Sequence, residues 1–326
     1  MSRYKEVWVN KDEDDTRLDR WVKRRVPGLN QAQIEKALRK GDIRVGGKKA
    51  KSNFRLRTGM QVKLPSFEVS VPSLPVRPMV NAKDQALIRS MVLFDDQQIM
   101  ALNKPSGLAV QGGTGTLRHI DGMLATFDDC ENLPKLVHRL DRDTSGLLLI
   151  GRTRTATASL AKAFQSRAAQ KTYLAIVLGT PRPHQGVIKG YMKKGVGQMG
   201  REMMVWGKHG ERDAQYSRSG YTVLSSAGQK ASLVALRPET GRTHQLRFHM
   251  AEIGYAISGD HKYVCDREPL GGLPDQMMLH AWGITLPHPE QGSFSLTCPL
   301  PKHFVDAMDM LGFERNIPSD PFAEME

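Results

Sequence analysis

The chain has 326 residues, with 47 Lys and Arg against 34 Asp and Glu and a formal net charge of +13. This length predicts two domains, each large enough to bury a core without disulfides or a structural metal. No apolar run reaches the ~18–20 residues of a membrane span, and the first residues lack an apolar signal segment, so we expect a cytoplasmic protein. Cys130, Cys265 and Cys298 form no CxxC pair, which argues against a disulfide framework and a zinc ribbon.

The positive charge lies almost entirely in one block. Residues 16–65 hold fifteen Lys and Arg and three acids, whereas residues 1–15 hold three bases and five acids and are taken as an N-terminal extension. A solvated basic face is the simplest account of a charge run. Because this block also has the apolar pattern of a folded core, the asymmetry favours a polyanionic partner.

The basic block predicts two helices followed by short strands. Thr16 and Asp19 form a capping-box-like start to the first helix, which Pro27-Gly28 ends. Asn30 is predicted to cap a second helix that ends at Gly41. Ile43 and Val45 alternate before the Gly46-Gly47 turn, and Met60, Val62 and Leu64 alternate before Pro65. The predicted inward residues of the helices are Leu18, Trp21, Val22, Ile34, Ala37 and Leu38.

This order of elements resembles the S-four domain, a small α/β RNA-binding module. The resemblance covers residues 15–65 and rests on Arg17-Leu18-Asp19, Leu38-Arg39-Lys40-Gly41 and Ile43-Arg44-Val45. It implies that this domain, residues 16–65, binds structured RNA mainly through phosphates. The RNA contacts expected from it are Arg17, Arg20, Arg39, Lys40, Arg44, Lys48 and Lys49.

Residues 66–82, with Pro72, Pro75 and Pro78, are predicted to form an extended linker. A second domain, residues 83–313, follows, and residues 314–326 are predicted to be an irregular tail. Short apolar runs rich in β-formers alternate with helical stretches, which predicts an α+β domain on a mixed, largely antiparallel sheet. The predicted strands are Met91–Phe94, Ile99–Leu102, Leu147–Ile150, Tyr173–Leu178 and Ser232–Leu236, and the predicted helices are Ala156–Gln165 and Thr243–Glu252.

Several common signatures are missing from the sequence or misleading. It contains no GxxxxGK[ST], HExxH or GxSxG motif. Residues 195–200 satisfy GxGxxG, but they follow Lys193-Lys194 rather than an apolar strand, so we expect a basic hairpin tip and no dinucleotide site.

The spacing of histidine and cysteine also argues against a metal site. His244 and His249 are five residues apart, off the i, i+4 spacing of two ligands on one helix face. His261 and Cys265 have no third or fourth ligand near them in the sequence. We therefore expect no bound metal.

Three segments carry more polar side chains than loops usually need. They are His138–Gly146 before an apolar strand, Lys171–Tyr173 at the start of another, and Thr240–His249 opening a helix. Each alone has a structural explanation: a turn at Asp143, an edge aromatic at Tyr173, or a helix cap at Thr240-Gly241. On the third segment Arg247 lies three residues after His244, off the apolar face of the helix.

Together the segments resemble the RluA-type pseudouridine synthases. The matching strings, in family order, are Lys104–Val110, His138–Gly146, Lys171–Ala175, Thr240–His249, Gly259-Asp260 with Tyr263, and Leu279-His280-Ala281. The resemblance covers about residues 84–300. An S-four domain in front resembles the RluC and RluD subgroup, which modifies large-subunit ribosomal RNA. The chain departs from the pattern at Gln111, where many relatives have His, and at His261-Lys262 before Tyr263.

The resemblance implies a pseudouridine-synthase fold and the isomerisation of uridine to pseudouridine. This reaction breaks a carbon–nitrogen glycosidic bond and rejoins the base through carbon, with no redox change or net hydrolysis, so no cofactor is expected. Asp141 matches the catalytic aspartate, and Arg247 matches the residue that keeps it ionised, which we expect to do so through two parallel hydrogen bonds. Arg139 matches the residue that fills the place of the flipped base. Tyr173 is expected to hold the detached uracil, and its hydroxyl is a candidate for later proton removal. Residues expected to bind substrate are His138, Thr144, Arg242, His244 and Gln245.

Two other classes of function remain as alternatives. A catalytically inactive RNA-binding or ribosome-assembly factor would lack Asp141, Tyr173 or Arg247, and all three are present. A metal-dependent nuclease would need clustered acids or histidines at ligand spacing. We expect a monomer that acts on large-subunit ribosomal RNA, free or within pre-ribosomal particles, and the motifs leave open which uridines it modifies.

Overall fold

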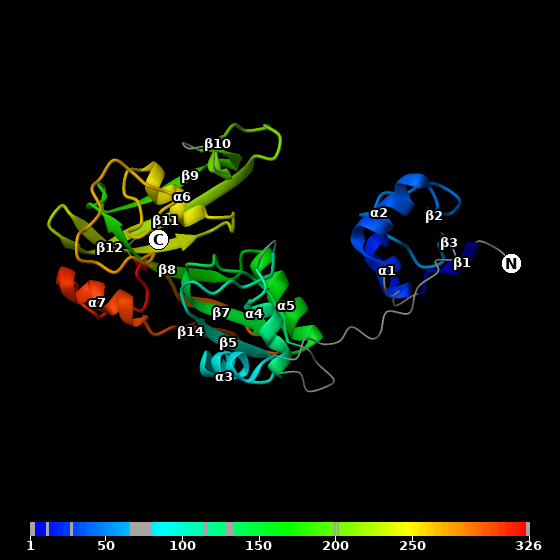
Figure 1. Ribbon diagram of the computed structural model, residues 1–326, viewed down its shortest axis with the longest axis horizontal. Coiled ribbons are helices and arrows are strands. Elements are labelled where there is room, and N and C mark those ends of the chain that lie inside the picture. Colours follow the sequence, from blue (N-terminus) through cyan, green and yellow to red (C-terminus); the bar gives the residue numbers. More distant parts are fainter. Residues whose placement is uncertain are drawn as a thin grey trace. The chain divides into compact units, whose positions relative to one another are not determined.

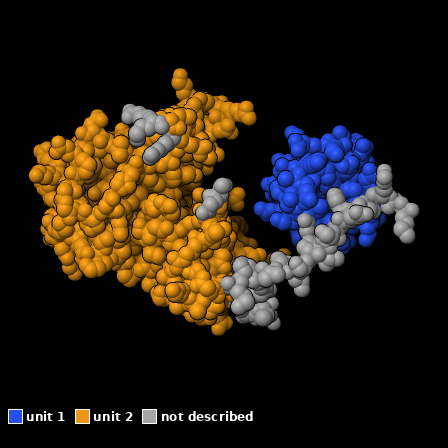
Figure 2. All heavy atoms as spheres, in the orientation of Figure 1, with its two compact units in different colours: residues 1–77 blue, residues 78–326 orange. Residues whose placement is uncertain are grey.

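The computed structural model describes residues 4–10, 13–26, 29–65, 80–113, 116–127, 134–197, 200 and 202–323. The chain divides into two compact units, residues 1–77 and residues 78–326 (Figure 2). Most of the predicted linker, residues 66–79, lies outside the described residues, as do Pro27-Gly28 and Cys130. In the part of the chain that is described, no helix is long and apolar enough to cross a lipid bilayer.

The first unit packs two helices on a small antiparallel sheet (Figure 1). Its elements are β1 (Tyr4–Trp8), α1 (Leu18–Arg25), α2 (Gln31–Lys40), β2 (Arg44–Val45) and β3 (Gln61–Pro65), with strand order β1-β3-β2. Asn30 caps α2 in a full capping box with Gln33, and Gly41 ends it at φ 82°. The predicted inward residues of both helices are buried, so the helix faces are confirmed.

The predicted start of the first helix is wrong. Arg17 is the N-cap of α1 and makes no side-chain cap bond. The Asp19 carboxylate instead accepts the Arg17 guanidinium at 2.7 Å and the Arg20 N–H at 2.8 Å. The Thr16 hydroxyl accepts a bond from Arg24. Because the partners of a capping box are engaged elsewhere, the Thr16–Asp19 pattern does not cap the helix.

Residues 1–15 are not a separate extension. Residues 4–8 form β1, which pairs antiparallel with β3 from Tyr4 opposite Pro65 to Trp8 opposite Gln61. Local pattern did not indicate this edge strand, because four of its five residues are exposed and only one is partly buried.

The second unit is built on an 11-stranded sheet with order β10-β9-β11-β12-β8-β13-β7-β5-β4, with β14 and β6 paired to β13 and β7 (Figure 1). Every strand pair in the described residues is antiparallel except β13 with β7. The strands are β4 (Val92–Asp95), β5 (Ile99–Lys104), β6 (Lys135–Leu136), β7 (Ser145–Gly151), β8 (Gln170–Leu178), β9 (Gln185–Val196), β10 (Glu202–Gly207), β11 (Gln215–Ala227), β12 (Ala231–Pro238), β13 (Leu279–Pro287) and β14 (Ser293–Thr297). The helices are α3 (Ala82–Ser90), α4 (Ile120–Met123), α5 (Arg154–Gln165), α6 (Gln245–Glu252) and α7 (Lys302–Leu311), with a 3₁₀ turn at Leu124–Phe127. The predicted strands and helices and the largely antiparallel sheet are confirmed.

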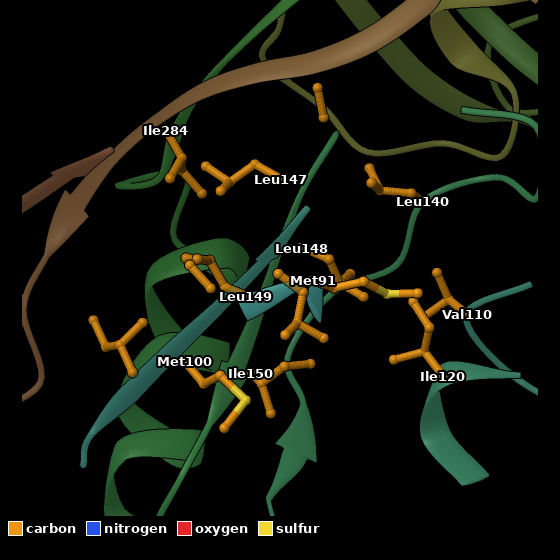
Figure 3. Packing of buried hydrophobic residues seen from close by; sticks show 14 of the residues in the cluster. Met91, Met100, Val110, Ile120, Leu140, Leu147, Leu148, Leu149, Ile150 and Ile284 are labelled. Carbon is orange, nitrogen blue, oxygen red and sulfur yellow. The ribbon is translucent and has the colours of Figure 1, made fainter. Parts of the chain in front are cut away.

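Two large hydrophobic clusters fill most of this unit, beside a small one of Met192, Met204, Phe248 and Tyr263. One gathers residues of β5 and β7 with α4 and the end of α3, and Figure 3 shows Leu148, Leu149 and Ile150 beside Met91 and Met100. The other joins β8, β12 and the helices α6 and α7. Tyr173 on β8 packs against both large clusters. This predicted catalytic residue therefore lies where the two clusters meet.

The C-terminal segment is irregular, as predicted, but it is part of the core. Residues 314–320 form no helix or strand. Phe322 is 2% exposed, and the Arg237 guanidinium lies 4.2 Å from the centre of its ring. Asp320 also pairs with Arg237 at 2.7 Å. The tail therefore covers the sheet rather than extending from it.

Candidate active site

The loop that carries Asp141 is held by a hydrogen bond from Lys104, the last residue of β5. The Lys104 ammonium is fully buried and donates to the carbonyls of Pro105, Leu108 and Arg142 at 2.7–2.9 Å. Burial lowers the pKa of Lys104 to about 7, while three carbonyl acceptors favour the ammonium form, which has three hydrogens to give. Lys104 thus ties the loop of Asp141, at Arg142, to the 105–108 turn. In the sequence it is only one residue of a longer motif.

Helix α6 carries the second half of the site and is pinned to β11. The Gln245 amide donates to the Arg218 carbonyl and the Ser219 hydroxyl, and its oxygen accepts from the Thr240 hydroxyl and the Arg242 N–H. One turn later, both ring nitrogens of His249 bond serine hydroxyls of β11, at 2.9 and 3.0 Å. These buried polar contacts fix the rotation of α6, so Arg247 faces the loop of Asp141.

Arg247 bridges two carboxylates. Its Nε and Nη2 donate to Asp260 at 2.6 and 2.8 Å, and its Nη1 donates to Asp141 Oδ2 at 3.3 Å. The predicted pair of parallel bonds to Asp141 is therefore wrong: the fork holds Asp260, whose side chain is fully buried, and Asp141 receives a single bond. Burial opposes the charge of Arg247, yet its bonds to Asp260 and the charges of both acids raise its pKa above the ordinary value.

Asp260 is a site residue that the sequence analysis missed. Its Oδ1 also accepts the backbone N–H groups of Lys262 and Tyr263, at 2.9 and 3.1 Å. The only signal was its place beside Gly259 in a string of the family, where a turn explains the same residues equally well.

Two cavities meet at Asp141. One, of about 600 Å³, is lined by Asp141, Tyr173 and Arg247 together with all five predicted substrate-binding residues, His138, Thr144, Arg242, His244 and Gln245. The other, of about 820 Å³, shares residues 139–141 with the first and is also lined by Asp260 and by residues of the 106–112 segment, including Gln111. Both cavities share the exposed Arg139, the predicted flipping residue.

The predicted catalytic residues are thus brought together across more than 100 residues of sequence. Tyr173 is a neutral phenol, because burial and then the charge of Asp141 raise its pKa above the ordinary value. A neutral phenol is a poor base, which weakens the expectation that this hydroxyl removes a proton. Its ring remains suited to contact with a base.

Three of the predicted substrate-binding residues have their polar atoms engaged by the protein. His138 Nε2 accepts the Leu149 N–H at 2.9 Å, its ring stacks on Phe164, and burial lowers its pKa to about 3. Gln245 is bonded at both ends of its amide, as described above. Arg242 donates to the Tyr216 carbonyl and the Gln215 side chain. These side chains hold the wall of the smaller cavity in shape.

Lys171 is a further cavity residue that the sequence analysis did not assign. It enters β8 two residues before Tyr173 and lines the smaller cavity. Burial lowers the pKa of its ammonium below the ordinary value. A cation in this wall is suited to binding a phosphate of the RNA. The sequence feature that could have indicated this role is its position two residues before Tyr173.

Six of the seven predicted RNA contacts of the first unit are exposed, and Arg17 is half-buried in its pair with Asp19. Arg44 donates to the carbonyls of Gly41 and Gly47, and Lys49 to that of Arg39. The basic side chains therefore flank the turn that follows α2.

The misleading motifs have structural explanations. Residues 195 and 196 end β9, which pairs antiparallel with β10, so the GxGxxG string spans a hairpin as predicted; residues 198, 199 and 201 lie outside the described residues. His261 pairs with Asp275 at 3.0 Å. Across the described ranges, no three His, Cys, Asp or Glu side chains gather as a metal site.

Known proteins resemble this chain in both of its units. The family model described as RNA pseudouridylate synthase matches residues 98–252, and the S4 (S-four) domain model matches residues 16–62. The chain is 32% identical to ribosomal large subunit pseudouridine synthase C of Pasteurella multocida, over 91% of this chain and 90% of the relative. It is 34% identical to the protein of the same name from Rickettsia bellii, over 89% and 96%. Among solved structures, human RNA pseudouridylate synthase domain containing 4 superimposes with a TM-score of 0.60 at 27% identity, over 71% of this chain and 98% of that one.

Proposed function

Because this chain belongs to the RNA pseudouridylate synthase family and carries an S-four domain, we propose that it isomerises specific uridines of large-subunit ribosomal RNA to pseudouridine. The similarity to relatives named for the large ribosomal subunit supports the choice of RNA. The basic S-four unit supports binding of a structured RNA through its phosphates.

The observation that carries the proposal is Asp141 at a cavity the size of a nucleotide. Its Oδ2 accepts one bond from Arg247 Nη1 at 3.3 Å, and its side chain keeps 22% exposure. Ligand pockets of about 300–1,000 Å³ take molecules of this size. Arg247 holds only Oδ2, and each carboxylate oxygen has two lone pairs, so Oδ1 keeps an electron pair to act on the sugar or the base.

The chemistry needs only groups that this cavity offers. The N1–C1′ bond breaks, the C5–C1′ bond forms, and a proton leaves C5 while N1 gains one, so atoms and electrons balance without a cofactor. Asp141 acts as nucleophile or as partner of the positive charge that develops on the sugar. The ring of Tyr173 holds the free uracil between the two steps.

The uridine reaches this cavity only if it leaves the RNA stack. Extrusion costs a few kcal/mol in a paired region. Arg139 is exposed and lines both cavities, so its guanidinium is available to occupy the vacated position.

The experiment that tests the function is pseudouridine mapping of large-subunit ribosomal RNA from a strain lacking this protein. We expect specific pseudouridines to disappear, to return with the wild-type protein and to stay absent with Asp141→Asn. If Asp141→Asn restored them, Asp141 would not be the catalytic carboxylate. If no pseudouridine disappeared, the chain would act on another RNA or serve as an assembly factor.

A further inference from the structure

His244 stands at the start of α6 with both ring nitrogens directed at other site residues. Its backbone has φ 53° and ψ 23°, the left-handed region that non-glycine residues rarely adopt. Its Nδ1 lies 2.9 Å from the Tyr263 hydroxyl, and its Nε2 lies 3.9 Å from Asp141 Oδ1. A strained backbone that brings a ring to a reactive carboxylate indicates a functional constraint.

The hydrogen bonds of Tyr263 determine which nitrogen of His244 carries the proton. The backbone N–H of Met204 can only donate, and it donates to the Tyr263 oxygen at 2.9 Å. The single hydrogen of that hydroxyl then has His244 Nδ1 as its acceptor. In the opposite arrangement Nδ1–H would donate to Tyr263, and the phenol hydrogen of this residue, which is 2% exposed as a whole, would have no acceptor among these partners.

The charge states of Tyr263 and His244 fit a hydrogen bond in which the Tyr263 hydroxyl donates to His244 Nδ1. Burial is the largest effect on each: it raises the pKa of Tyr263, so the phenol keeps its hydrogen. Burial lowers the pKa of His244 although Asp141 acts against it, so the imidazole is neutral near pH 7 and has one N–H. A neutral imidazole that accepts at Nδ1 carries its hydrogen on Nε2.

We propose that Tyr263 sets the tautomer of His244, and that His244 Nε2–H thereby positions Asp141 by donating to Oδ1 during the reaction. The proposal deepens the proposed function and rests on it. Arg247 Nη1 already binds Oδ2, so a second donor at Oδ1 fixes the rotation of the carboxylate. The 3.9 Å gap must shorten by about 1 Å to form a hydrogen bond, and catalytic bonds of this kind commonly tighten when substrate binds.

The tautomer can be measured without any substrate. In long-range ¹H–¹⁵N correlation spectra of the ¹⁵N-histidine-labelled protein, the His244 ring should show the Nε2–H form in the wild type. Tyr263→Phe removes the hydroxyl that donates to Nδ1, so a mixture with the Nδ1–H form should appear. An Nδ1–H signal in the wild type, or no change in Tyr263→Phe, would overturn the assignment whatever the activity.

The consequence for catalysis is tested with a matched pair. His244→Gln and His244→Met have similar length and meet the same left-handed backbone, but only Gln has an N–H to offer Asp141. Loss of a bond to a charged group lowers a rate about tenfold or more, so the Met variant should lose that much in single-turnover rate and the Gln variant should recover most of it. RNA affinity should be equal in both. Equal rates for Gln and Met would mean that the donor is unnecessary.

A double-mutant cycle separates the tautomer from mere packing. Tyr263→Phe should slow the wild type several-fold but have little further effect in His244→Met, where no tautomer remains to be set. If the losses multiply, Tyr263 acts through Met204 or its packing, and the proposal fails. If the wild type itself makes no pseudouridine, the proposed function fails while the spectra still decide the tautomer.

Discussion

At the scale of single residues, the Arg247 guanidinium that faces Asp141 is held in place by a second acid, Asp260. Sequence motifs could predict Asp141, Tyr173 and Arg247, because each lies in a string specific to the family. They could not predict that the Arg247 fork binds Asp260, since that pairing depends on where the 259–263 turn lies in the folded chain. The local sequence Gly259-Asp260 would look the same if Asp260 only formed a turn.

This arrangement predicts that Asp260→Asn impairs catalysis without touching the substrate. The amide keeps the volume but loses the charge that holds Nε and Nη2 of Arg247, so Nη1 is no longer fixed toward Asp141. Loss of a charge-assisted bond is worth about 10- to 100-fold in single-turnover rate. RNA affinity should stay near the wild-type value.

Asp266→Asn, at an exposed position of the same segment, is the control and should keep the full rate. Arg247→Lys should resemble Asp260→Asn, because one ammonium cannot bridge two carboxylates in place of the planar fork. Full activity of Asp260→Asn would remove Asp260 from the positioning of Arg247.

For Arg139 the prediction concerns how the pairing of the target uridine in the RNA affects the rate. Since it is assigned to base extrusion, Arg139→Ala should slow modification of a paired uridine more than that of a mismatched or single-stranded one, by about tenfold or more. Single-turnover rates on two RNAs of the same sequence, paired and unpaired, measure this ratio. Equal losses on both would assign Arg139 to phosphate binding.

At the scale of elements, local pattern predicted the helices and strands that bury a continuous face. The capping box at Asn30, the left-handed stop at Gly41 and the fully buried β7 all follow from short-range rules. Strand β1 was missed because its partner β3 lies more than 50 residues away and supplies the stabilisation. The parallel pairing of β7 with β13 likewise has no local signal.

The close pairing of β7 with β13 predicts that adding one methyl group at Gly146 lowers stability strongly. Gly146, the second residue of β7, has φ 107°, and a Cβ there would lie 2.3 Å from the Ala281 carbonyl oxygen of β13. Gly146→Ala should therefore lower the free energy of unfolding by about 2–4 kcal/mol, from backbone strain and a forced separation of the strands.

Gly210→Ala is the control, because Gly210 has φ 77° but a Cβ would meet nothing within 4 Å. It should cost about 1 kcal/mol, from backbone strain alone. Urea unfolding midpoints with unchanged slopes measure both values. Similar losses for the two variants would show that the approach of β7 to β13 is not tight in solution.

At the scale of the whole molecule, charge and chemistry are divided between the two units. The fifteen basic residues of positions 16–65 lie in the first unit, and Asp141, Tyr173 and Arg247 lie in the second. We therefore expect a chain of residues 78–326 to isomerise short RNAs at high concentration, but to bind long RNA weakly.

The salt dependence of binding measures that division. Each phosphate contact adds about 0.7–0.9 to the slope of log affinity against log salt, so removing residues 1–77 should flatten the slope by several units. In the full chain, Lys48→Gln with Lys49→Gln should flatten it by about 1.4–1.8 if both contact phosphate. An unchanged slope after removal of residues 1–77 would mean that the basic unit faces something other than RNA.

The proposal common to these predictions is that the Asp141 carboxylate converts uridine to pseudouridine with no metal. Its most direct test is tritium release from a ribosomal RNA fragment labelled at C5 of uridine, under single-turnover conditions with a chelator present. We expect full release by the wild type and by Asp143→Asn, whose side chain is half-exposed and paired with Arg142. For Asp141→Asn we expect less than a few per cent of that rate, about a hundredfold loss, with unchanged RNA affinity. Release by Asp141→Asn at a rate near that of Asp143→Asn, or loss of wild-type release with the chelator, would contradict it.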